Sequence, residues 1–227
     1  FGLYEFTRMP FGLCNAAQTF QRFIADVLRC LPRVFVYLDD ILIASRDHEQ
    51  HALDIAEVLR RLSEAGLVVS PDKCEFGKAS LQFLGHLIDK DGIRPLPDKV
   101  QAIKDFPRPI NEQDMGRFLG MVAYYHRFIP RCASIATPLH KMKTAAGKTQ
   151  HKLLMWEATT EKAFQDLKNA LSASALLAFP KIGATTRLRM ITDALELGMG
   201  GVVEQLDGCL WHPIAFFSKQ WASAEKN

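Results

Sequence analysis

The stretch VFVYLDDILIAS, residues 34–45, places two adjacent carboxylates, Asp39 and Asp40, between two runs of large apolar residues. The runs at 34–36 and 41–44 indicate two short strands that the acids separate. Two ionised neighbours inside a sheet would be costly unless water or a cation neutralised them. The pattern therefore predicts a β-hairpin that turns near the acids and exposes them to solvent.

A pair of carboxylates held on a rigid hairpin suits a magnesium site. Mg²⁺ keeps several waters and binds through one or two carboxylates together with substrate phosphates. Two such ions, roughly 3.5–4 Å apart, stabilise both the attacking and the leaving oxygen of a phosphoryl transfer. The alternative is ordinary turn chemistry, because Asp is a favoured turn residue. The bulky flanks and the absence of Gly favour a functional pair.

Around the hairpin, the spacing of apolar residues predicts helices on both sides. One helix is expected over 15–31. A second should begin after Asp47 as N-cap and end at Gly66. Its predicted inner face consists of Leu53, Ala56, Leu59 and Leu62. Short strands are then expected at 67–70, 74–76 and 81–88, with a turn at 90–92.

From residue 93 the pattern becomes helical. Pro97 should start a short helix, and Asn111 should cap a longer one that carries Met115, Phe118, Leu119, Val122 and Phe128. Further helices are expected over 133–142 and 160–171, and strands follow from residue 187. The predicted regions are therefore 1–92, a helical bundle at 93–144, a connector with one amphipathic helix at 145–186, and a β-rich region at 187–227.

Composition sets the class of protein. The chain has 227 residues, 48% of them hydrophobic, and a net charge of +3, which is weak evidence for a nucleic-acid partner. The five cysteines form no C-x-x-C pair, which fits a reducing compartment. No apolar run approaches the ~20 residues of a membrane span, and no signal peptide is visible. The chain begins with Phe and stops in mid-pattern, so we expect an excerpt from a longer polypeptide.

The order of several motifs resembles one family. YLDD at 37–40 resembles the aromatic-x-Asp-Asp signature of reverse transcriptases. MPFGLCNAAQTFQRFI, at 9–24, is similar to the block that precedes it in gypsy-type LTR retrotransposons. GLVVSPDKCEF and LQFLGHLI resemble the blocks that complete the palm, and GRFLGMVAYYHRFIP and ASIATPLHKM resemble the thumb. WEATTEKAFQDLKNAL and ITDALELGMGGVVEQ resemble the entry to the RNase H-like domain, so the resemblance covers essentially the whole chain.

The resemblance implies an α+β fold: a palm with an antiparallel sheet and helices, a helical thumb, and the first part of an RNase H-like α/β domain. It implies RNA-directed DNA polymerase activity within a Pol polyprotein, with a two-metal Mg²⁺ site that Mn²⁺ could also fill. The implied partners are an RNA or DNA template–primer duplex, dNTPs, and the protease and integrase of the same polyprotein, with no membrane. The implied location is cytoplasmic, in virus-like particles, or nuclear, and not secreted.

Residue by residue, Asp39 would be a metal-binding catalytic carboxylate and Asp40 its support. The nucleotide and template pocket would be lined by Pro10, Phe11, Gly12, Tyr37 and Lys73. For Lys73 an ordinary surface lysine is the alternative. The block that grips the primer end would be Phe83, Leu84 and Gly85.

Asp193, in T-D-A, resembles the first metal-binding Asp of RNase H, at the centre of a sheet. Leu195 stands where the family usually has Ser. The alternative is an RNase H-like connection domain without activity. The family also needs a third polymerase Asp from a strand before the P-F-G-L block, and further RNase H carboxylates after residue 227. The chain as given is therefore expected to be inactive. The alternative to a fragment of an active parent polymerase is a degenerate or host-retained fragment that at most binds nucleic acid.

Other candidates are weaker. The run His48-Glu49-Gln50-His51 lacks metal-site spacing and predicts a solvated helix start. Gly198-x-Gly200-Gly201 predicts a close backbone approach inside a sheet. Tyr125 is a candidate core residue, and Arg127 a candidate contact to the template–primer backbone. A basic connector could also contact duplex phosphates. Its lysines are Lys141, Lys143, Lys148 and Lys152. The alternative is that this segment is a solvated linker.

Overall fold

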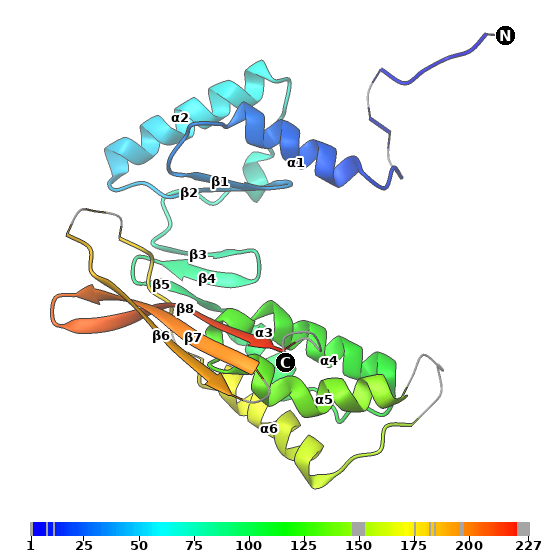
Figure 1. The fold of residues 1–227 in the computed structure, drawn as a ribbon. Helices are drawn as coiled ribbons and strands as arrows, with labels where there is room; N and C mark the ends of the chain where they lie inside the picture. The colour runs from blue at the N-terminus through cyan, green and yellow to red at the C-terminus, as the bar shows by residue number, and fades with distance from the viewer. Residues whose placement is uncertain are drawn as a thin grey trace. The chain divides into compact units, whose positions relative to one another are not determined.

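The computed structural model describes residues 2–7, 9–10, 12–146, 153–174, 176–181, 183, 185–195 and 198–221, with the backbone alone at 145, 146 and 195. The chain forms two compact units, Phe1–Ala79 and Ser80–Asn227. Each has a hydrophobic core of its own, and Figure 1 shows their elements. Among the helices in this described part, none combines the length and apolar character of a membrane span.

The first unit packs two helices with a hairpin. Its elements are α1 (Ala16–Val27), β1 (Val34–Tyr37), β2 (Asp40–Ile43), α2 (His48–Glu64) and the 3₁₀ turn η1 (Pro71–Lys73). The strands pair antiparallel from Val34↔Ile43 to Tyr37↔Asp40, which leaves a two-residue loop. The fully buried core consists of Ile24, Leu28, Val58 and Leu62. The predicted hairpin and the helix before it are confirmed.

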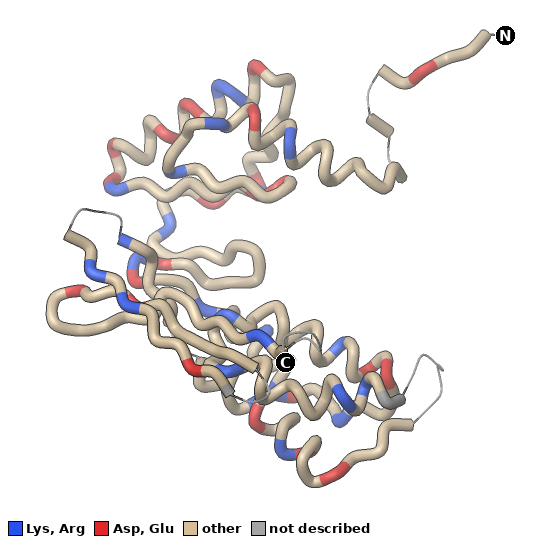
Figure 2. The backbone as a smooth tube through the Cα atoms, viewed as in Figure 1, with Lys and Arg blue, Asp and Glu red and all other residues tan. Residues whose placement is uncertain are grey.

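Helix α2 begins and ends where the sequence predicts. The Asp47 side chain accepts a hydrogen bond from the Gln50 N–H at 2.8 Å, and Gly66, with φ +72°, follows the last turn. Figure 2 shows both acidic and basic residues along this helix. Arg60, for example, pairs with Glu57 and Glu64. At the helix start, where a solvated face was predicted, His48 and Glu49 are exposed, and Gln50 and His51 are half-buried.

The predicted inner face of α2 is wrong for three of its four members. Leu53 and Leu59 are 65% and 41% exposed, and Ala56 is also exposed. Leu62, the fourth member, is buried as predicted, and it is joined by Val58. Asp54, one turn before Val58, lies on this inward side of the helix and binds Arg33, so a polar side chain occupies part of the face that was expected to be apolar.

The strands expected at 67–70 and 74–76 are also absent from the described structure. Pro71 starts η1 there, because its fixed φ favours a local turn. The segment expected as one strand at 81–88 is two, β3 (Ser80–Phe83) and β4 (His86–Asp89), since the chain reverses at Leu84 and Gly85. The predicted turn before β5 (Gly92–Pro95) is confirmed.

The second unit surrounds one large core with helices. These are α3 (Pro97–Lys104), α4 (Glu112–Tyr124), the 3₁₀ turn η2 (His126–Phe128), α5 (Cys132–Ala146) and α6 (Ala158–Ser172). The predicted helices are confirmed, including the Asn111 cap, which accepts from the Asp114 N–H at 2.9 Å. One member of the predicted long helix is wrong, because α4 ends at Tyr124 and Phe128 lies in η2. Side chains with almost no exposed surface include Met115, Phe118, Phe128, Leu139, Phe164, Leu167 and Leu171.

Two three-stranded sheets complete this unit, in the orders β3-β4-β5 and β6-β7-β8. The second sheet consists of β6 (Leu188–Leu195), β7 (Gly198–Asp207) and β8 (Leu210–Gln220), as predicted. In the first sheet, Ile93 exchanges backbone hydrogen bonds with Leu177 at 2.9 and 3.0 Å. The β3-β4-β5 sheet thus belongs to the same compact unit as the helices. The proposed limits at 92/93, 144/145 and 186/187 remain predictions.

Candidate active site

The two carboxylates lie on the hairpin of the first unit. Asp39 is the second residue of the two-residue loop, and Asp40 begins β2 opposite Tyr37. Both acids are exposed. Leu38, the first loop residue, has φ +50°, in the left-handed region that a leucine rarely adopts. The hairpin therefore presents its acids to solvent through a strained loop.

One side chain from α1 holds this loop in place. The Gln21 amide oxygen accepts a hydrogen bond from the Leu38 N–H at 2.6 Å. The amide nitrogen of the same side chain donates to the Val36 carbonyl at 3.2 Å. Gln21 was not among the residues predicted from the sequence, although there was a signal. It lies three residues before Ile24 on the buried face of an amphipathic helix, where a polar side chain needs a partner.

The open end of the hairpin is held by an ion-pair network. Arg33, just before β1, binds both carboxylate oxygens of Asp54 at 2.8 Å. Ser45, after β2, donates to the same carboxylate at 2.6 Å, and Gln50 donates at 2.9 Å. The hydrogen bonds from Arg33 and then Ser45 hold the pKa of Asp54 well below its usual range. This network ties the base of the hairpin to α2.

The remaining nucleotide-pocket residues are more dispersed. Tyr37 is 53% exposed and lies beside the acids on the hairpin. Lys73 is exposed at the end of η1. Gly12 has φ +90°, and a Cβ built there would meet open space among the described residues. Phe11 lies outside the described residues, whereas Pro10, just before it, is half-buried.

The predicted primer-grip residues form a turn in the second unit. Leu84 and Gly85, with φ +45° and +69°, join the paired residues Phe83 and His86. The Tyr124 hydroxyl donates to the Leu84 carbonyl at 2.5 Å, and the Tyr125 hydroxyl donates to the Gly85 carbonyl at 2.8 Å. Tyr125 is only 4% exposed, so its predicted core position is confirmed.

Asp193 lies on β6, paired with Gly200 of β7, and its side chain is exposed. Within the described residues β6 is the outer strand of the sheet, whereas the centre was expected. The predicted close approach at the glycines is confirmed. A Cβ added at Gly198 would lie 2.5 Å from the Lys219 carbonyl oxygen, and one at Gly201 would lie 2.5 Å from a Phe217 ring carbon.

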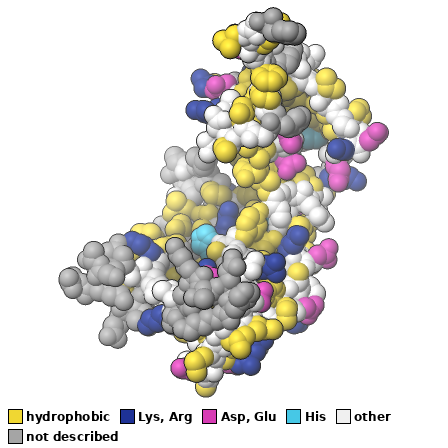
Figure 3. All heavy atoms as spheres, turned by 90° about the vertical axis from the view of Figure 1, so that its right-hand side faces the viewer, with side chains coloured by type: hydrophobic (Ala, Val, Ile, Leu, Met, Phe, Trp, Pro, Cys, Tyr) yellow, Lys and Arg dark blue, Asp and Glu magenta, His cyan; other side chains and the backbone are white. Residues whose placement is uncertain are grey.

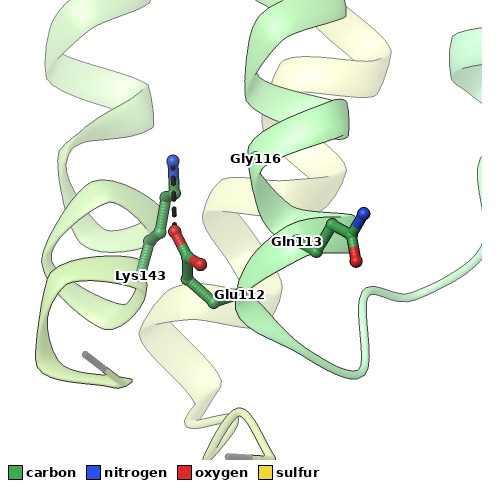
Figure 4. A pocket seen from close by; sticks show the side chains of 4 residues that line it. All are labelled: Glu112, Gln113, Gly116 and Lys143. Carbon is green, nitrogen blue, oxygen red and sulfur yellow. Dashed lines mark ion pairs between the residues drawn. The ribbon is translucent and has the colours of Figure 1, made fainter. Parts of the chain in front are cut away.

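The basic candidates differ in their surroundings. Lys143 lies 3.5 Å from a Glu112 carboxylate oxygen across the shallow pocket at Gly116, while Gln113 points to the other side (Figure 4). Lys141 is exposed, and both Lys141 and Lys143 lie on α5, so this part of the expected connector is helix. Lys148 and Lys152 lie outside the described residues. The exposed Arg127 places its guanidinium 5.5 Å from the centre of the Phe128 ring.

Charged side chains of both signs lie among apolar ones on the face drawn in Figure 3. Within the described residues, no three His, Cys, Asp or Glu side chains gather as a metal-binding group. The exposed oxygens of Asp39 and Asp40 are still the ligand type that a hard divalent cation takes. The chain thus offers a carboxylate pair suited to a metal that also contacts substrate phosphates.

Comparisons with known families agree with this arrangement. Residues 1–88 match the family described as reverse transcriptase (RNA-dependent DNA polymerase), and residues 156–227 match an RNase H-like domain found in reverse transcriptase. The retrovirus-related Pol polyprotein from transposon 297 of Drosophila melanogaster is 39% identical over 228 residues. Those from transposons opus and gypsy of the same fly are 37% and 36% identical. Each alignment covers 100% of this chain but only 21–23% of the relative.

Solved structures show the same fold. The foamy viral protease-reverse transcriptase in complex with an RNA/DNA hybrid matches with a TM-score of 0.79 at 23% identity, over 97% of this chain and 29% of that one. The same viral protein in complex with dsDNA matches with a TM-score of 0.78, over 97% of this chain and 45% of that one. These matches confirm the expected α+β fold. The family matches show that this chain belongs to the reverse transcriptase family, and over its whole length it is similar to the Pol polyproteins of gypsy-type retrotransposons.

Proposed function

We propose that this chain provides palm and thumb elements of an RNA-directed DNA polymerase that extends a primer along an RNA or DNA template with dNTPs. The observation that carries the proposal is the exposed Asp39–Asp40 pair on a hairpin that other side chains hold at both ends. The foamy viral protein is seen with dsDNA and with an RNA/DNA hybrid, which supports a template–primer duplex as the partner.

Divalent metal, with Mg²⁺ as the physiological ion and Mn²⁺ as a substitute, is part of this proposal. Asp39 would hold the ion, with Asp40 in support, and the bound ion would stabilise negative charge on the phosphates. The chain's own contribution is to hold the carboxylates still. Gln21 fixes the loop, and the Arg33–Asp54 pair fixes the hairpin base.

Substrate contacts are proposed for the other matched positions. Gly12 leaves open space in which a nucleotide could approach the backbone closely. Pro10, Phe11 and Tyr37 would add flat contact that tolerates any base, and Lys73 would neutralise triphosphate charge. Asp193 would serve an RNase H-like site. The whole protein would act in the cytoplasm, in virus-like particles, or in the nucleus, beside the protease and integrase of its polyprotein.

The decisive experiment substitutes Asp39→Asn in the full reverse transcriptase–RNase H polypeptide. Primer extension should fall by about 10³-fold or more, because metal stabilisation of the transition state supplies several kcal/mol. Template–primer affinity should change little, since contacts to phosphates elsewhere supply it.

The matched control is Asp91→Asn, the same change at an exposed acid in the turn between β4 and β5. It should extend primers as the wild type does. Extension by Asp39→Asn at a near-normal rate would contradict the assignment. A wild type that binds the duplex without extending the primer would instead favour the non-catalytic alternative.

A further inference from the structure

We propose that Tyr124 and Tyr125, together with His86, are positioning residues that hold the Leu84–Gly85 turn in the shape in which it contacts the primer end. The proposal rests on the proposed function, because the primer contact of this turn is itself proposed. The two tyrosines lie on α4 and at its end, 40 positions along the chain from the turn, whereas His86 begins β4 directly after it.

The turn needs support because of its sequence. Phe83 and His86 pair across β3 and β4, so Leu84 and Gly85 form a two-residue loop. Both have positive φ, which is the pattern of a type I′ turn. That turn favours Asn-Gly, because Asn tolerates the left-handed region and Leu does not. A leucine in the first position therefore biases the isolated hairpin against the observed conformation.

Side-chain donors converge on the two carbonyls of this turn. The Leu84 carbonyl accepts from the Tyr124 hydroxyl at 2.5 Å and lies 2.6 Å from Nδ1 of His86. The Gly85 carbonyl accepts from the Tyr125 hydroxyl at 2.8 Å and from the Leu96 N–H at 3.3 Å. Both carbonyls of an otherwise unfavourable turn are thus hydrogen-bonded to tyrosine hydroxyls at the end of α4.

The rings that carry these donors pack against one another. The His86 ring stacks on Tyr124 at 5.5 Å between centroids and meets Tyr125 edge-on at 5.6 Å. Tyr124 and Tyr125 are themselves perpendicular at 4.9 Å. The site also depends on Gly85, since a Cβ there would lie 3.2 Å from a Tyr124 ring carbon and 3.3 Å from the Tyr125 hydroxyl oxygen. Glycine at this position leaves room for both hydroxyls.

The consequence is mechanical. The turn is fixed to the end of α4 and cannot change its backbone conformation without breaking these hydrogen bonds. If the turn contacts the primer end, its rigidity limits how far that end can move from the metal-bound nucleotide. Loosening the turn should therefore speed dissociation of template–primer and shorten each round of synthesis, while the dNTP concentration for half-maximal rate stays nearly constant.

The test compares Tyr124→Phe, Tyr125→Phe and the double variant in the full reverse transcriptase–RNase H polypeptide. Each change removes one donor and keeps the ring. Tyr4→Phe, at a tyrosine that is 88% exposed, is the matched control. In the double variant, hydrogen exchange of the amides in residues 80–95 should quicken by about 10-fold, because removing each hydrogen bond changes the opening equilibrium several-fold. Dissociation of a template–primer duplex should quicken by a similar factor.

Leu84→Asn supplies the rescue. The resulting Asn-Gly pair adopts a type I′ turn unaided, so the two Tyr→Phe changes should speed exchange much less in the Leu84→Asn background. An equally large effect in both backgrounds would show that the hydroxyls do not act by holding the turn, and would overturn the proposal.

Two further results would also overturn it: unchanged exchange in the double variant, or faster exchange without faster dissociation of the duplex. Failure of the proposed function looks different. A wild type that binds the duplex but adds no nucleotide would refute polymerase activity, while exchange and duplex dissociation would still test the role of the tyrosines.

Discussion

At the scale of single residues, the candidate active site depends on side chains that do no chemistry themselves. The Gln21 side chain forms hydrogen bonds with two backbone groups beside the acids, where Leu38 has a φ of +50°. Holding a leucine in this region costs roughly 1–2 kcal/mol. The loop therefore keeps its shape only while its surroundings favour it, and Gln21 is the side chain placed to do so.

Replacing Gln21 should separate this support from the chemistry. Gln21→Leu removes both hydrogen bonds and is expected to lower single-turnover nucleotide addition by about 10-fold, because a displaced carboxylate holds the metal poorly. Gln21→Glu keeps the acceptor for the Leu38 N–H but loses the donor to the Val36 carbonyl. Its rate should therefore lie between those of the wild type and Gln21→Leu. Rapid-quench measurement on a preformed template–primer complex tests this, with Gln113→Leu, at an exposed position of α4, as the control. Equal rates for Gln21→Leu and the wild type would show that the loop holds itself.

At the scale of elements, the sequence predicted the helices and turns whose limits depend only on neighbouring residues. Asp47 and Asn111 cap their helices as expected, because a cap involves only the next turn. The face of α2 was wrong because a partly buried ion pair, between residues 21 positions apart, places a polar side chain on the inward face. The acids and their hairpin were likewise predictable from a short motif. The supports at Gln21, Tyr124 and Tyr125 were not predicted, because each of them joins segments distant in the chain.

The β6-β7-β8 sheet offers a test of close packing at the scale of elements. A Cβ at Gly201 would lie 2.5 Å from a Phe217 ring carbon and 2.8 Å from the Ile191 carbonyl oxygen. Gly201→Ala should therefore lower the free energy of unfolding by about 1–3 kcal/mol, as overpacking does. Gly120→Ala is the matched change in the exposed part of α4, where a Cβ would meet open space among the described residues. It should raise stability by about 0.5–1 kcal/mol. Urea unfolding measures both, and the same sign for the two would contradict this account of the packing.

At the scale of the whole molecule, the proposed polymerase residues belong to two compact units. The carboxylate hairpin lies in Phe1–Ala79, and the primer-contact turn lies in Ser80–Asn227. Synthesis would need the hairpin and the turn to act on one duplex. A surface that binds the duplex whatever its sequence would keep it available to both of them. Backbone phosphates are the features that such a surface can use, and Lys and Arg are the side chains that neutralise them.

The connector lysines and the exposed Arg127 are the candidates for that surface. Changing Lys141, Lys143, Lys148 and Lys152 together to Gln should weaken duplex binding and flatten its salt dependence. The slope of log K against log salt should become shallower by about 0.9 for each phosphate that the variant no longer neutralises. Lys143→Gln alone should contribute least, because its ammonium already lies 3.5 Å from Glu112.

Titrations at several salt concentrations, with two unrelated duplex sequences, measure this change in slope. Lys181→Gln is the control, since that lysine pairs with Asp207 and is not one of the four lysines of the proposed surface. An unchanged slope in the fourfold variant would show that the connector is a solvated linker, and would leave Arg127 to be tested by itself.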